Sequence, residues 1–406
     1  MSLWNLILLV IGGMFALQLF ALLVLMVHAR LSKPNTQATA FPTCEIPEIL
    51  VHHTQVQVYT EGTHLFADML AAIESAEKTI FIESYIWKAD ELGRRFKDLL
   101  ARKAEEGVAV YVIYDSFANL VVPRRFFSFP NTMHVLRFRA WRKPWHALDL
   151  RRWGRDHRKI LVVDNRIGFV GGYNIGELYR TSWRDTHMRL EGTEVDDLVF
   201  SFTDFWNANR SRNLPRLPTP IRSWSAELRA YRNDPHQLIF PIRSIYIEAI
   251  EQAQHHIYIT SAYFIPDEAI LRALERAARR GVDVRVLVPW DSNHVLADWL
   301  ARHNFSRCLR QGVRIFAYQN SMIHAKSATI DGIWSTIGTA NIDRLSLLGN
   351  FEINIEIFNT DLARVMDEIF ECDLTNAFEI MPEKWARRPW LARAGELILA
   401  PLWPLL

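Results

Sequence analysis

The chain has 406 residues, of which 50% are hydrophobic and 23% are charged. This composition is typical of a globular protein with one large domain or two ordinary ones, and it excludes an intrinsically disordered chain. The net charge is only +2, and the three cysteines (Cys44, Cys308 and Cys372) lie far apart with no Cys-x-x-Cys pair. Neither a zinc knuckle nor a disulfide framework is therefore indicated.

Residues 4–27 are expected to form an uncleaved transmembrane anchor. No charged residue occurs between Trp4 and Val27, and a helix of this length reaches about 36 Å, enough to cross a hydrocarbon core of about 30 Å. A signal peptide is the alternative, but no Lys or Arg precedes the apolar run, which is also long for such a peptide. Arg30 and Lys33 follow the run, and by the positive-inside rule they predict that the remaining chain lies on the cytoplasmic side.

An internal repeat determines the predicted fold. Residues 72–87 (AIESAEKTIFIESYIW) resemble residues 249–264 (AIEQAQHHIYITSAYF), and residues 99–115 resemble residues 273–289. Each copy has a helical pattern that leads into a strand pattern, and Gly107 and Gly281 stand where a helix ends. The sequence therefore predicts an α/β protein with two pseudo-symmetric halves, residues 45–206 and 237–375, each a mostly parallel sheet flanked by helices.

Two segments fall outside the repeat. Residues 207–236 contain four prolines and few periodic apolar residues, which predicts a connector between the halves. Residues 376–406 combine tryptophan and leucine with arginine and are interrupted by proline. This segment is too short to span a bilayer, and it is expected either to lie in the membrane interface or to pack on the domain.

The same short motif, H-x-K-x4-D-x6-G-x2-N, occurs once in each half. The first copy comprises His157, Lys159, Asp164, Gly171 and Asn174, and the second comprises His324, Lys326, Asp331, Gly338 and Asn341. One chance match to five fixed positions has a probability of roughly one in ten thousand. His and Lys two positions apart on a strand point to the same face, so imidazole and ammonium converge on one place.

The doubled motif resembles the HKD signature of the phospholipase D superfamily. Within that superfamily the stretches IESYIW (82–87), RDHRKILVVDNRIGFVGGYNIG (155–176), WRDTHMRLEG (183–192) and TSAYFIP (260–266) look like those of bacterial cardiolipin synthases. The similarity extends over most of residues 55–375. Two motif copies in one chain distinguish it from the single-motif nucleases, which assemble a site by dimerising.

The resemblance implies a single active site at a pseudo-two-fold axis, with one histidine attacking phosphorus and the other serving as general acid and base. We assign His157 as the nucleophile and His324 as the acid. The non-bridging phosphate oxygens would be held by Lys159, Lys326, Asn174 and Asn341, with a further hydroxyl from Thr339. Gly172 stands where the family often has Ser. The resemblance requires no metal and no cofactor.

Four acidic residues complete the expected site. Asp185 and Glu352 each follow a motif histidine by 28 positions, and the resemblance implies that such a residue orients the catalytic imidazole. A surface salt bridge is the alternative for both. Asp164 and Asp331 belong to the catalytic motif, although a structural role is the alternative for them.

A basic, tryptophan-rich insert precedes His157 and has no counterpart in the second half. Residues 139–156 contain Arg139, Trp141, Arg142, Lys143, Trp145, Arg151, Arg152, Trp153 and Arg155. This mixture suits an anionic lipid headgroup region, although it could also bind nucleic acid. The expected anchor favours lipid, so phospholipid and membrane are the expected partners and nucleic acid is not.

The expected reaction moves a phosphatidyl group from one phospholipid to phosphatidylglycerol, through a phosphohistidine, and gives cardiolipin and a small alcohol. Phosphatidylglycerol and phosphatidylethanolamine both remain open as donors, and no oligomeric state is predicted. A hydrolase of the same superfamily that acts on phospholipid or nucleic acid is the alternative. A non-catalytic scaffold is disfavoured because both motifs are intact. The expected location is a bacterial inner membrane.

Overall fold

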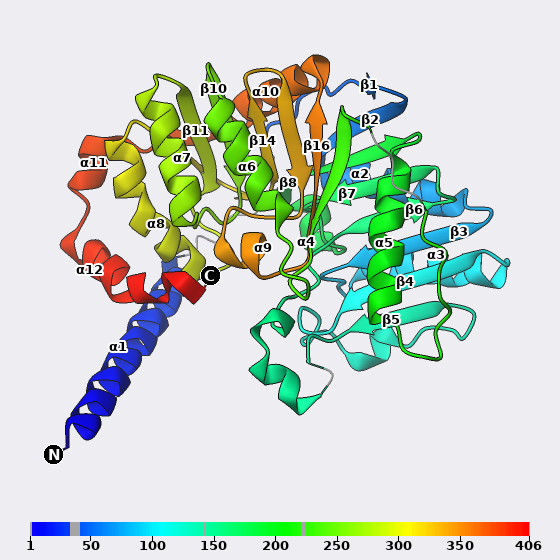
Figure 1. The fold of residues 1–406 in the computed structure, drawn as a ribbon, viewed down its shortest axis with the longest axis horizontal. Coiled ribbons are helices and arrows are strands. Elements are labelled where there is room, and N and C mark those ends of the chain that lie inside the picture. Colours follow the sequence, from blue (N-terminus) through cyan, green and yellow to red (C-terminus); the bar gives the residue numbers. More distant parts are fainter. Residues whose placement is uncertain (1, 33–40, 142, 221–224, 406) are drawn as a thin grey trace.

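The computed structural model describes residues 2–32, 41–141, 143–220 and 225–405. Figure 1 shows two α/β halves side by side and one long helix, α1 (Leu3–Ser32), that projects from the lower side of the body. Residues Trp4–Val27 of α1 have a mean hydropathy of 2.6, and this is the one stretch among the described residues that is long and apolar enough to cross a membrane. Lys33 and the side chain of Arg30, which carry the predicted orientation, lie outside the described residues.

The first half contains a sheet with the order β1-β2-β8-β7-β6-β3-β4-β5. Its strands are β1 (Ile49–Val51), β2 (Thr54–Glu61), β3 (Thr79–Ser84), β4 (Ala109–Asp115), β5 (His134–Phe138), β6 (Ile160–Val163), β7 (Ile167–Gly171) and β8 (Trp183–Glu191). Its helices are α2 (Gly62–Glu74), α3 (Glu91–Glu105), α4 (Glu177–Thr181) and α5 (Val195–Asn209), with short 3-10 turns η1 (Arg124–Phe127), η2 (Pro144–Leu148) and η3 (Leu150–Arg152).

The second half repeats this plan with the strand order β17-β12-β11-β10-β14-β15-β16-β9. Its strands are β9 (Leu228–Asn233), β10 (His256–Ser261), β11 (Asp283–Pro289), β12 (Arg314–Tyr318), β13 (Met322–Ile323), β14 (Lys326–Ile330), β15 (Trp334–Gly338), β16 (Glu352–Phe358) and β17 (Ala377–Glu379). Its helices are α6 (Pro241–Gln252), α7 (Glu268–Arg279), α8 (Val295–Arg310), α9 (Arg344–Leu348) and α10 (Thr360–Leu374).

The two predicted α/β halves are confirmed, but their sheets are mixed rather than mostly parallel. Within each half, β3, β4 and β5, and likewise β10, β11 and β12, run parallel to one another. From β6 and β14 onward neighbouring strands of the same half are antiparallel. The physical reason is connection length, because β6 and β7 are joined by only three residues, and a connection that short permits an antiparallel hairpin but no parallel crossover.

The repeated helix–strand units have the predicted local chemistry. Asp90 and Asp267 cap α3 and α7, because each carboxylate accepts hydrogen bonds from backbone N–H groups of the first helical turn. Gly107 and Gly281 then end the turns that follow the two helices, with φ angles of +97° and +90° that side chains rarely tolerate. Each helix therefore stops at the same point and turns the chain into the neighbouring strand.

A shared core and a buried ion pair join the halves. One hydrophobic cluster contains α5, α10 and strands of both sheets. Arg184 of β8 donates from Nε and Nη2 to both carboxylate oxygens of Asp373 in α10, at 2.8 and 2.7 Å, and both side chains are buried. In addition, β13 of the second half pairs with β8 of the first. The halves therefore form one body whose interface contains hydrogen-bonded backbone from both.

The C-terminal helices lie between the body and α1. They are α11 (Pro382–Ala386), α12 (Trp390–Leu399) and the 3-10 turn η4 (Ala400–Leu405). Gln18 of α1 donates from Nε2 to the Ile398 carbonyl at 3.2 Å, and α12 also contacts α8. Trp390 and Leu397 remain exposed. Within the predicted connector, β9 forms the edge of the second sheet, and residues 221–224 lie outside the described residues.

Candidate active site

The two motif histidines lie where the halves meet. His157 and His324 precede β6 and β14, strands that run antiparallel to β3 and β10, so both motifs begin at the carboxyl ends of the parallel strands. The backbone N–H of His157 donates to the Phe351 carbonyl at 3.0 Å, and that of His324 donates to the Arg184 carbonyl at 2.6 Å. Each histidine is thus held by backbone from the opposite half.

The imidazoles exchange carboxylate partners between the halves. His157 Nδ1 lies 3.0 Å from Glu352 Oε2, and His324 Nδ1 lies 2.6 Å from Asp185 Oδ2. All four side chains are buried or nearly so. A carboxylate at Nδ1 favours the tautomer with its proton on that nitrogen, and it leaves Nε2 of each ring available to a substrate. The carboxylates therefore act on the histidine that is distant in sequence, not on the one 28 positions before.

The two carboxylates differ electrostatically. Burial by itself would raise the pKa of Asp185, but the Lys326 ammonium and the His324 ring outweigh it and lower that pKa. Burial dominates at Glu352 and raises its pKa to about 8, even though Lys159 opposes the shift. Asp185 is therefore the stronger anion at neutral pH, and its imidazole partner is the better placed to carry a positive charge.

The two motif lysines point to the same region. Lys159 Nζ donates to the carbonyl of His157 at 2.6 Å, and Lys326 Nζ donates likewise to the carbonyl of His324. Burial lowers the pKa of Lys159 to about 7 and that of Lys326 to about 8. Burial, reinforced by these ammonium groups, also lowers the pKa of His324 to about 3. An anionic ligand would reverse these shifts because it stabilises every cation around it.

Thr339 and Gly172 occupy equivalent places but differ in function. The Thr339 hydroxyl donates to Glu352 Oε2 at 2.5 Å and accepts from the Ile353 N–H at 2.9 Å. The Thr339 hydroxyl therefore lies where it can hold the Glu352 carboxyl group in place, with the Ile353 carbonyl as a second acceptor at 3.3 Å. The predicted phosphate-binding role of Thr339 stays a prediction. A Cβ at Gly172 would lie 2.0 Å from Asp185 Oδ1, so the carboxylate fills the space that a serine side chain would need.

The two motif asparagines have different environments. Asn174 Oδ1 accepts a hydrogen bond from the Ile86 N–H at 3.2 Å. Asn341 is equally buried, but its Oδ1 has no hydrogen-bond partner among the described residues. An unsatisfied buried amide oxygen is unusual, but as an acceptor it cannot bind a phosphate oxygen, so only the Asn341 amide N–H groups could donate to a phosphate. The predicted phosphate-binding role of both residues stays a prediction.

Asp164 and Asp331 lie at the far end of the motif strands. Each follows its histidine by seven residues, a distance of about 20 Å along an extended chain. Asp164 accepts three backbone N–H groups, from Glu77, Lys78 and Thr79, all at 2.8 Å. Asp331 binds residues 254–256 in the same way. The geometry supports the structural alternative for both, because these carboxylates fasten the turn before β3 and β10.

Several aromatic side chains that were not predicted from the sequence lie against the two imidazoles. The Tyr85 ring lies edge-on to His157 with centroids 4.6 Å apart, and Lys159 Nζ lies 5.3 Å from the centre of the same ring. Trp183 and Tyr263 lie 5.0 and 6.3 Å from His324. Tyr85 and Tyr263 come just after the repeated strands β3 and β10, and this position was the available sequence signal, whereas Trp183 begins β8.

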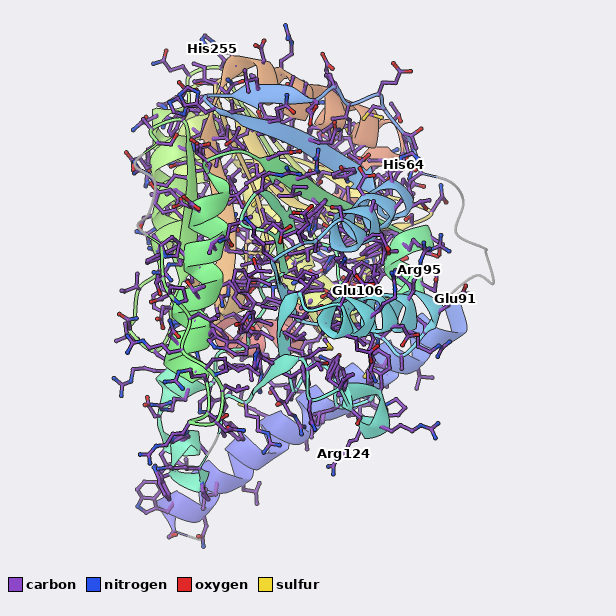
Figure 2. All side chains as sticks on the ribbon, turned by 90° about the vertical axis from the view of Figure 1, so that its right-hand side faces the viewer. His64, Glu91, Arg95, Glu106, Arg124 and His255 are labelled. Atoms are coloured by element: carbon purple, nitrogen blue, oxygen red, sulfur yellow. The ribbon has the colours of Figure 1, made fainter. Side chains whose placement is uncertain are left out.

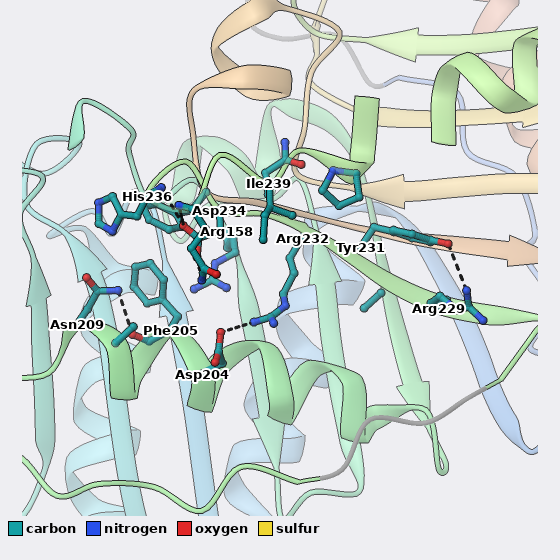
Figure 3. A pocket seen from close by; sticks show the side chains of 16 residues that line it. Arg158, Asp204, Phe205, Asn209, Arg229, Tyr231, Arg232, Asp234, His236 and Ile239 are labelled. Atoms are coloured by element: carbon teal, nitrogen blue, oxygen red, sulfur yellow. Dashed lines mark hydrogen bonds and ion pairs between the residues drawn. The ribbon is translucent and has the colours of Figure 1, made fainter. Parts of the chain in front are cut away.

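A separate pocket of about 410 Å³ lies on the other side of the motif strand. Figure 3 shows it between α5 and the β9 region, with the Arg232–Asp204 ion pair (2.6 Å) on one wall and Arg158 at its floor. Arg158 stands between His157 and Lys159, so its side chain points away from theirs. Arg158 is bound to the buried carboxylates Glu83 and Asp156. This pocket is therefore not the space in front of the imidazoles.

The described residues contain no group of three His, Cys, Asp or Glu side chains that could hold a metal ion. The chemistry available at the site is that of two imidazoles, two ammonium groups and two carboxylates. A pair of oriented imidazoles next to buried cations suits nucleophilic attack and proton transfer at an anionic phosphorus centre.

Comparisons with known proteins show which family the chain is similar to. A family model described as the phospholipase D-like domain of cardiolipin synthase matches residues 69–202 and 246–374. The chain is 32% identical to a cardiolipin synthase of Clostridium perfringens, over 86% of this chain and 77% of that protein. It is also 32% identical to a cardiolipin synthase of Listeria monocytogenes, over 88% and 77% of the two chains.

Solved structures extend the likeness of the fold. The phosphatidylserine synthase of Haemophilus influenzae aligns with a TM-score of 0.63 at 13% identity, covering 87% of this chain and 96% of that one. A polyphosphate kinase of Porphyromonas gingivalis aligns with a TM-score of 0.50 at 12% identity, covering 78% and 50%. At these identities the likeness concerns the fold alone.

Proposed function

The chain belongs to the cardiolipin synthase family of phospholipase D-like proteins, and from this premise we propose that it is a phosphatidyltransferase that makes cardiolipin. The observation that carries the proposal is the crossed arrangement of the site. Two buried imidazoles, each oriented by a carboxylate of the opposite half, face one region that two ammonium groups share. A phosphodiester is the ligand that such a site would stabilise.

The proposed first step forms a covalent intermediate. Nε2 of His157 attacks the phosphorus of a donor phospholipid, and the bond from phosphorus to the headgroup oxygen breaks. His324 transfers its proton to that oxygen, so the headgroup leaves as a neutral alcohol and the phosphatidyl group stays on His157. Lys159 and Lys326 hold the non-bridging oxygens as their charge increases, and Asn174 and Asn341 are proposed to assist them.

The second step reverses the roles. His324, now neutral, accepts the proton from the terminal hydroxyl of phosphatidylglycerol, whose oxygen attacks phosphorus while the bond to His157 breaks. Cardiolipin leaves and both histidines return to their starting state. With phosphatidylglycerol as donor the released alcohol is glycerol, and with phosphatidylethanolamine it is ethanolamine. One phosphodiester replaces another, so the overall reaction needs no nucleotide.

The assignment of His157 as nucleophile follows from the difference between the carboxylates. The general acid must be an imidazolium when the substrate is bound, and His324 lies 2.6 Å from the anionic Asp185. His157 faces Glu352, whose pKa is raised to about 8 and which already accepts the Thr339 hydroxyl. The weaker field at His157 favours the neutral imidazole that a nucleophile requires.

The proposed location is a bacterial inner membrane with the catalytic body on its cytoplasmic side. Residues Trp4–Val27 supply a single span. The first cations after that span, Arg30 and Lys33, support the orientation under the positive-inside rule.

Lipid turnover by the purified full-length protein tests the proposal. The protein in detergent is incubated with phosphatidylglycerol alone and then with added phosphatidylethanolamine, and lipids and released alcohols are identified by mass spectrometry. Cardiolipin together with glycerol or ethanolamine, lost in both His157→Ala and His324→Ala, is the expected result. Formation of phosphatidic acid without cardiolipin would contradict the transferase and indicate that the protein is a hydrolase.

A further inference from the structure

The charge of this protein is concentrated in one stretch at the catalytic entrance. Residues 116–155, here called the rim segment, contain nine basic residues and a single acidic one, Asp149. The basic residues are Arg124, Arg125, Arg137, Arg139, Arg142, Lys143, Arg151, Arg152 and Arg155. The rim segment therefore carries +8, and because the whole chain carries +2, the remaining residues together carry −6. A strongly cationic surface on an otherwise acidic protein indicates an anionic partner.

The rim segment also exposes large apolar side chains. Val121, Leu148 and Leu150 are 83, 87 and 78% exposed, and Phe117, Leu120, Trp141, Trp145 and Trp153 are exposed as well. Single exposed apolar residues are ordinary on a protein surface, but a group of this size within forty residues marks an interaction site. Cations and tryptophans around aliphatic tips are typical of residues that enter the interface of a bilayer.

Contacts join the two ends of the rim segment next to the active site. The Arg155 guanidinium lies 3.8 Å from the centre of the Phe117 ring, and the rings of Trp141 and Trp153 lie 5.3 Å apart. The next residue after the segment, Asp156, donates its N–H to Asp115 Oδ2 at 3.1 Å and directly precedes His157. The loop after β4 and the insert before β6 are therefore one continuous surface beside the nucleophile.

The anchor leaves the body on the same side. In Figures 1 and 2 the turns η2 and η3 of the rim segment lie on the lower side of the molecule, toward which α1 projects, and Arg124 points downward in Figure 2. A bilayer that contains α1 would thus be close to the rim segment.

We propose that the rim segment docks on an anionic phospholipid bilayer, with Val121, Leu148 and Leu150 in the acyl region and the arginines among the headgroups. The proposal rests on the function proposed above and adds the surface through which the substrate arrives. Nucleic acid is the other anionic partner, but it would be held by stacked rings and phosphate contacts, whereas aliphatic tips suit hydrocarbon. Lipids would then reach His157 by lateral movement along the rim, without leaving the leaflet.

Site-specific quenching tests the docking separately from catalysis. Leu148→Cys, Val121→Cys and the control Ile333→Cys are labelled with a fluorophore in the full-length protein in proteoliposomes, with Cys44 and Cys372 replaced by serine throughout. Ile333 is 53% exposed in the turn between β14 and β15, at the opposite end of its sheet from the active site. Lipids brominated on the acyl chain should quench the labels at 148 and 121 at least threefold more than the label at 333. Equal quenching at the three positions would overturn the proposal.

The charge and kinetic consequences are tested with matched variants. Leu148→Glu/Leu150→Glu should raise the apparent KM for phosphatidylglycerol, expressed as mole fraction, about tenfold while kcat changes less than twofold. The control Leu50→Glu/Ile333→Glu changes two exposed apolar residues away from the rim and should match the wild type. Arg124→Gln/Arg125→Gln should reduce quenching of the rim labels in phosphatidylglycerol vesicles and leave it unchanged in phosphatidylcholine vesicles. The control Arg166→Gln should leave quenching unchanged in both.

The outcomes separate the docking from the enzymatic function. Quenching at the rim without lipid turnover would support docking and contradict the phosphatidyltransferase. A normal KM in the rim variants would overturn the docking proposal. So would a fluorescence change of the labels at 121 and 148 on addition of single-stranded DNA but not of vesicles. In either case the proposed enzymatic function would still be decided by the lipid turnover experiment.

Discussion

The replacement Asp185→Asn tests the division of labour between the histidines. Asp185 is buried and anionic and lies 2.6 Å from His324 Nδ1. Two unit charges about 4 Å apart interact by about 4 kcal/mol at an effective dielectric constant of about 20. Loss of the carboxylate charge should therefore lower the pKa of the His324 imidazolium in the substrate complex by about 3 units, and reduce kcat by about 10³-fold.

The size of the rate loss in Asp185→Asn should depend on the leaving group of the substrate. Glycerol or ethanolamine must receive a proton from His324 as it departs, whereas p-nitrophenolate leaves without one at neutral pH. A phosphatidyl p-nitrophenol substrate should therefore restore the first step in Asp185→Asn to within about tenfold of the wild type. The size and rate of the p-nitrophenol burst, followed in detergent micelles, report that step alone. Turnover of phosphatidylglycerol, measured as cardiolipin, should stay low.

Two variants complete the experiment. Glu352→Gln changes the partner of the proposed nucleophile, so its burst should stay slow with either leaving group. Asp164→Asn makes the same chemical change about 20 Å away along the strand and should leave the burst unchanged. If Glu352→Gln is the variant that the better leaving group restores, His324 is the nucleophile and the assignment is wrong. If neither variant is restored, the electrostatic argument fails.

Four further predictions concern residues that support the site. Gly172→Ser should lower kcat at least 100-fold without unfolding the protein, since its Cβ would lie 2.0 Å from Asp185 Oδ1. Thr339→Val should lower kcat, while Thr339→Ser keeps the hydroxyl and should not. Asp164→Asn should lower the free energy of unfolding, measured by denaturant titration, by about 1–3 kcal/mol at neutral pH. Three N–H groups lower the pKa of the Asp164 carboxyl in the folded protein, so its stabilising contribution is present above the unfolded pKa of about 3.9 and is lost as the pH falls through the lower folded pKa. The stabilities of the variant and the wild type should therefore converge in acid. Asp373→Asn should cost about 3–5 kcal/mol because it leaves Arg184 buried and unpaired, and an unchanged thermal midpoint would contradict that role.

Those features of the fold that depend on local sequence patterns could be predicted. The helix–strand repeats, Gly107 and Gly281 after their helices, and a long apolar helix over residues 4–27 follow from periodicity and composition, and the structure has them where expected. The share of parallel strands was overestimated. Helix–strand alternation predicts parallel pairs, but it says nothing about the strands after each motif, which short turns make antiparallel.

Individual side-chain roles were predictable only in part. A motif can place a hydroxyl near a phosphate site, but it does not predict that Thr339 Oγ1 lies 2.5 Å from Glu352 Oε2. The structure likewise shows that the absence of a side chain at Gly172 leaves room for Asp185. Such roles depend on which group fills a space of a few ångströms, and the spacing of residues along a chain does not contain that information.

By itself, the sequence predicted which residues meet at the site: the histidines and lysines of two motif copies, two carboxylates 28 positions after the histidines, and a basic insert before one of them. Only the tertiary structure decided which carboxylate serves which histidine. The partners are 195 and 139 residues apart, and the equal spacing of 28 fits pairing within a half as well as pairing across the halves. The choice is made where the halves pack, because β13 joins β8 and the His157 N–H binds Phe351 next to Glu352.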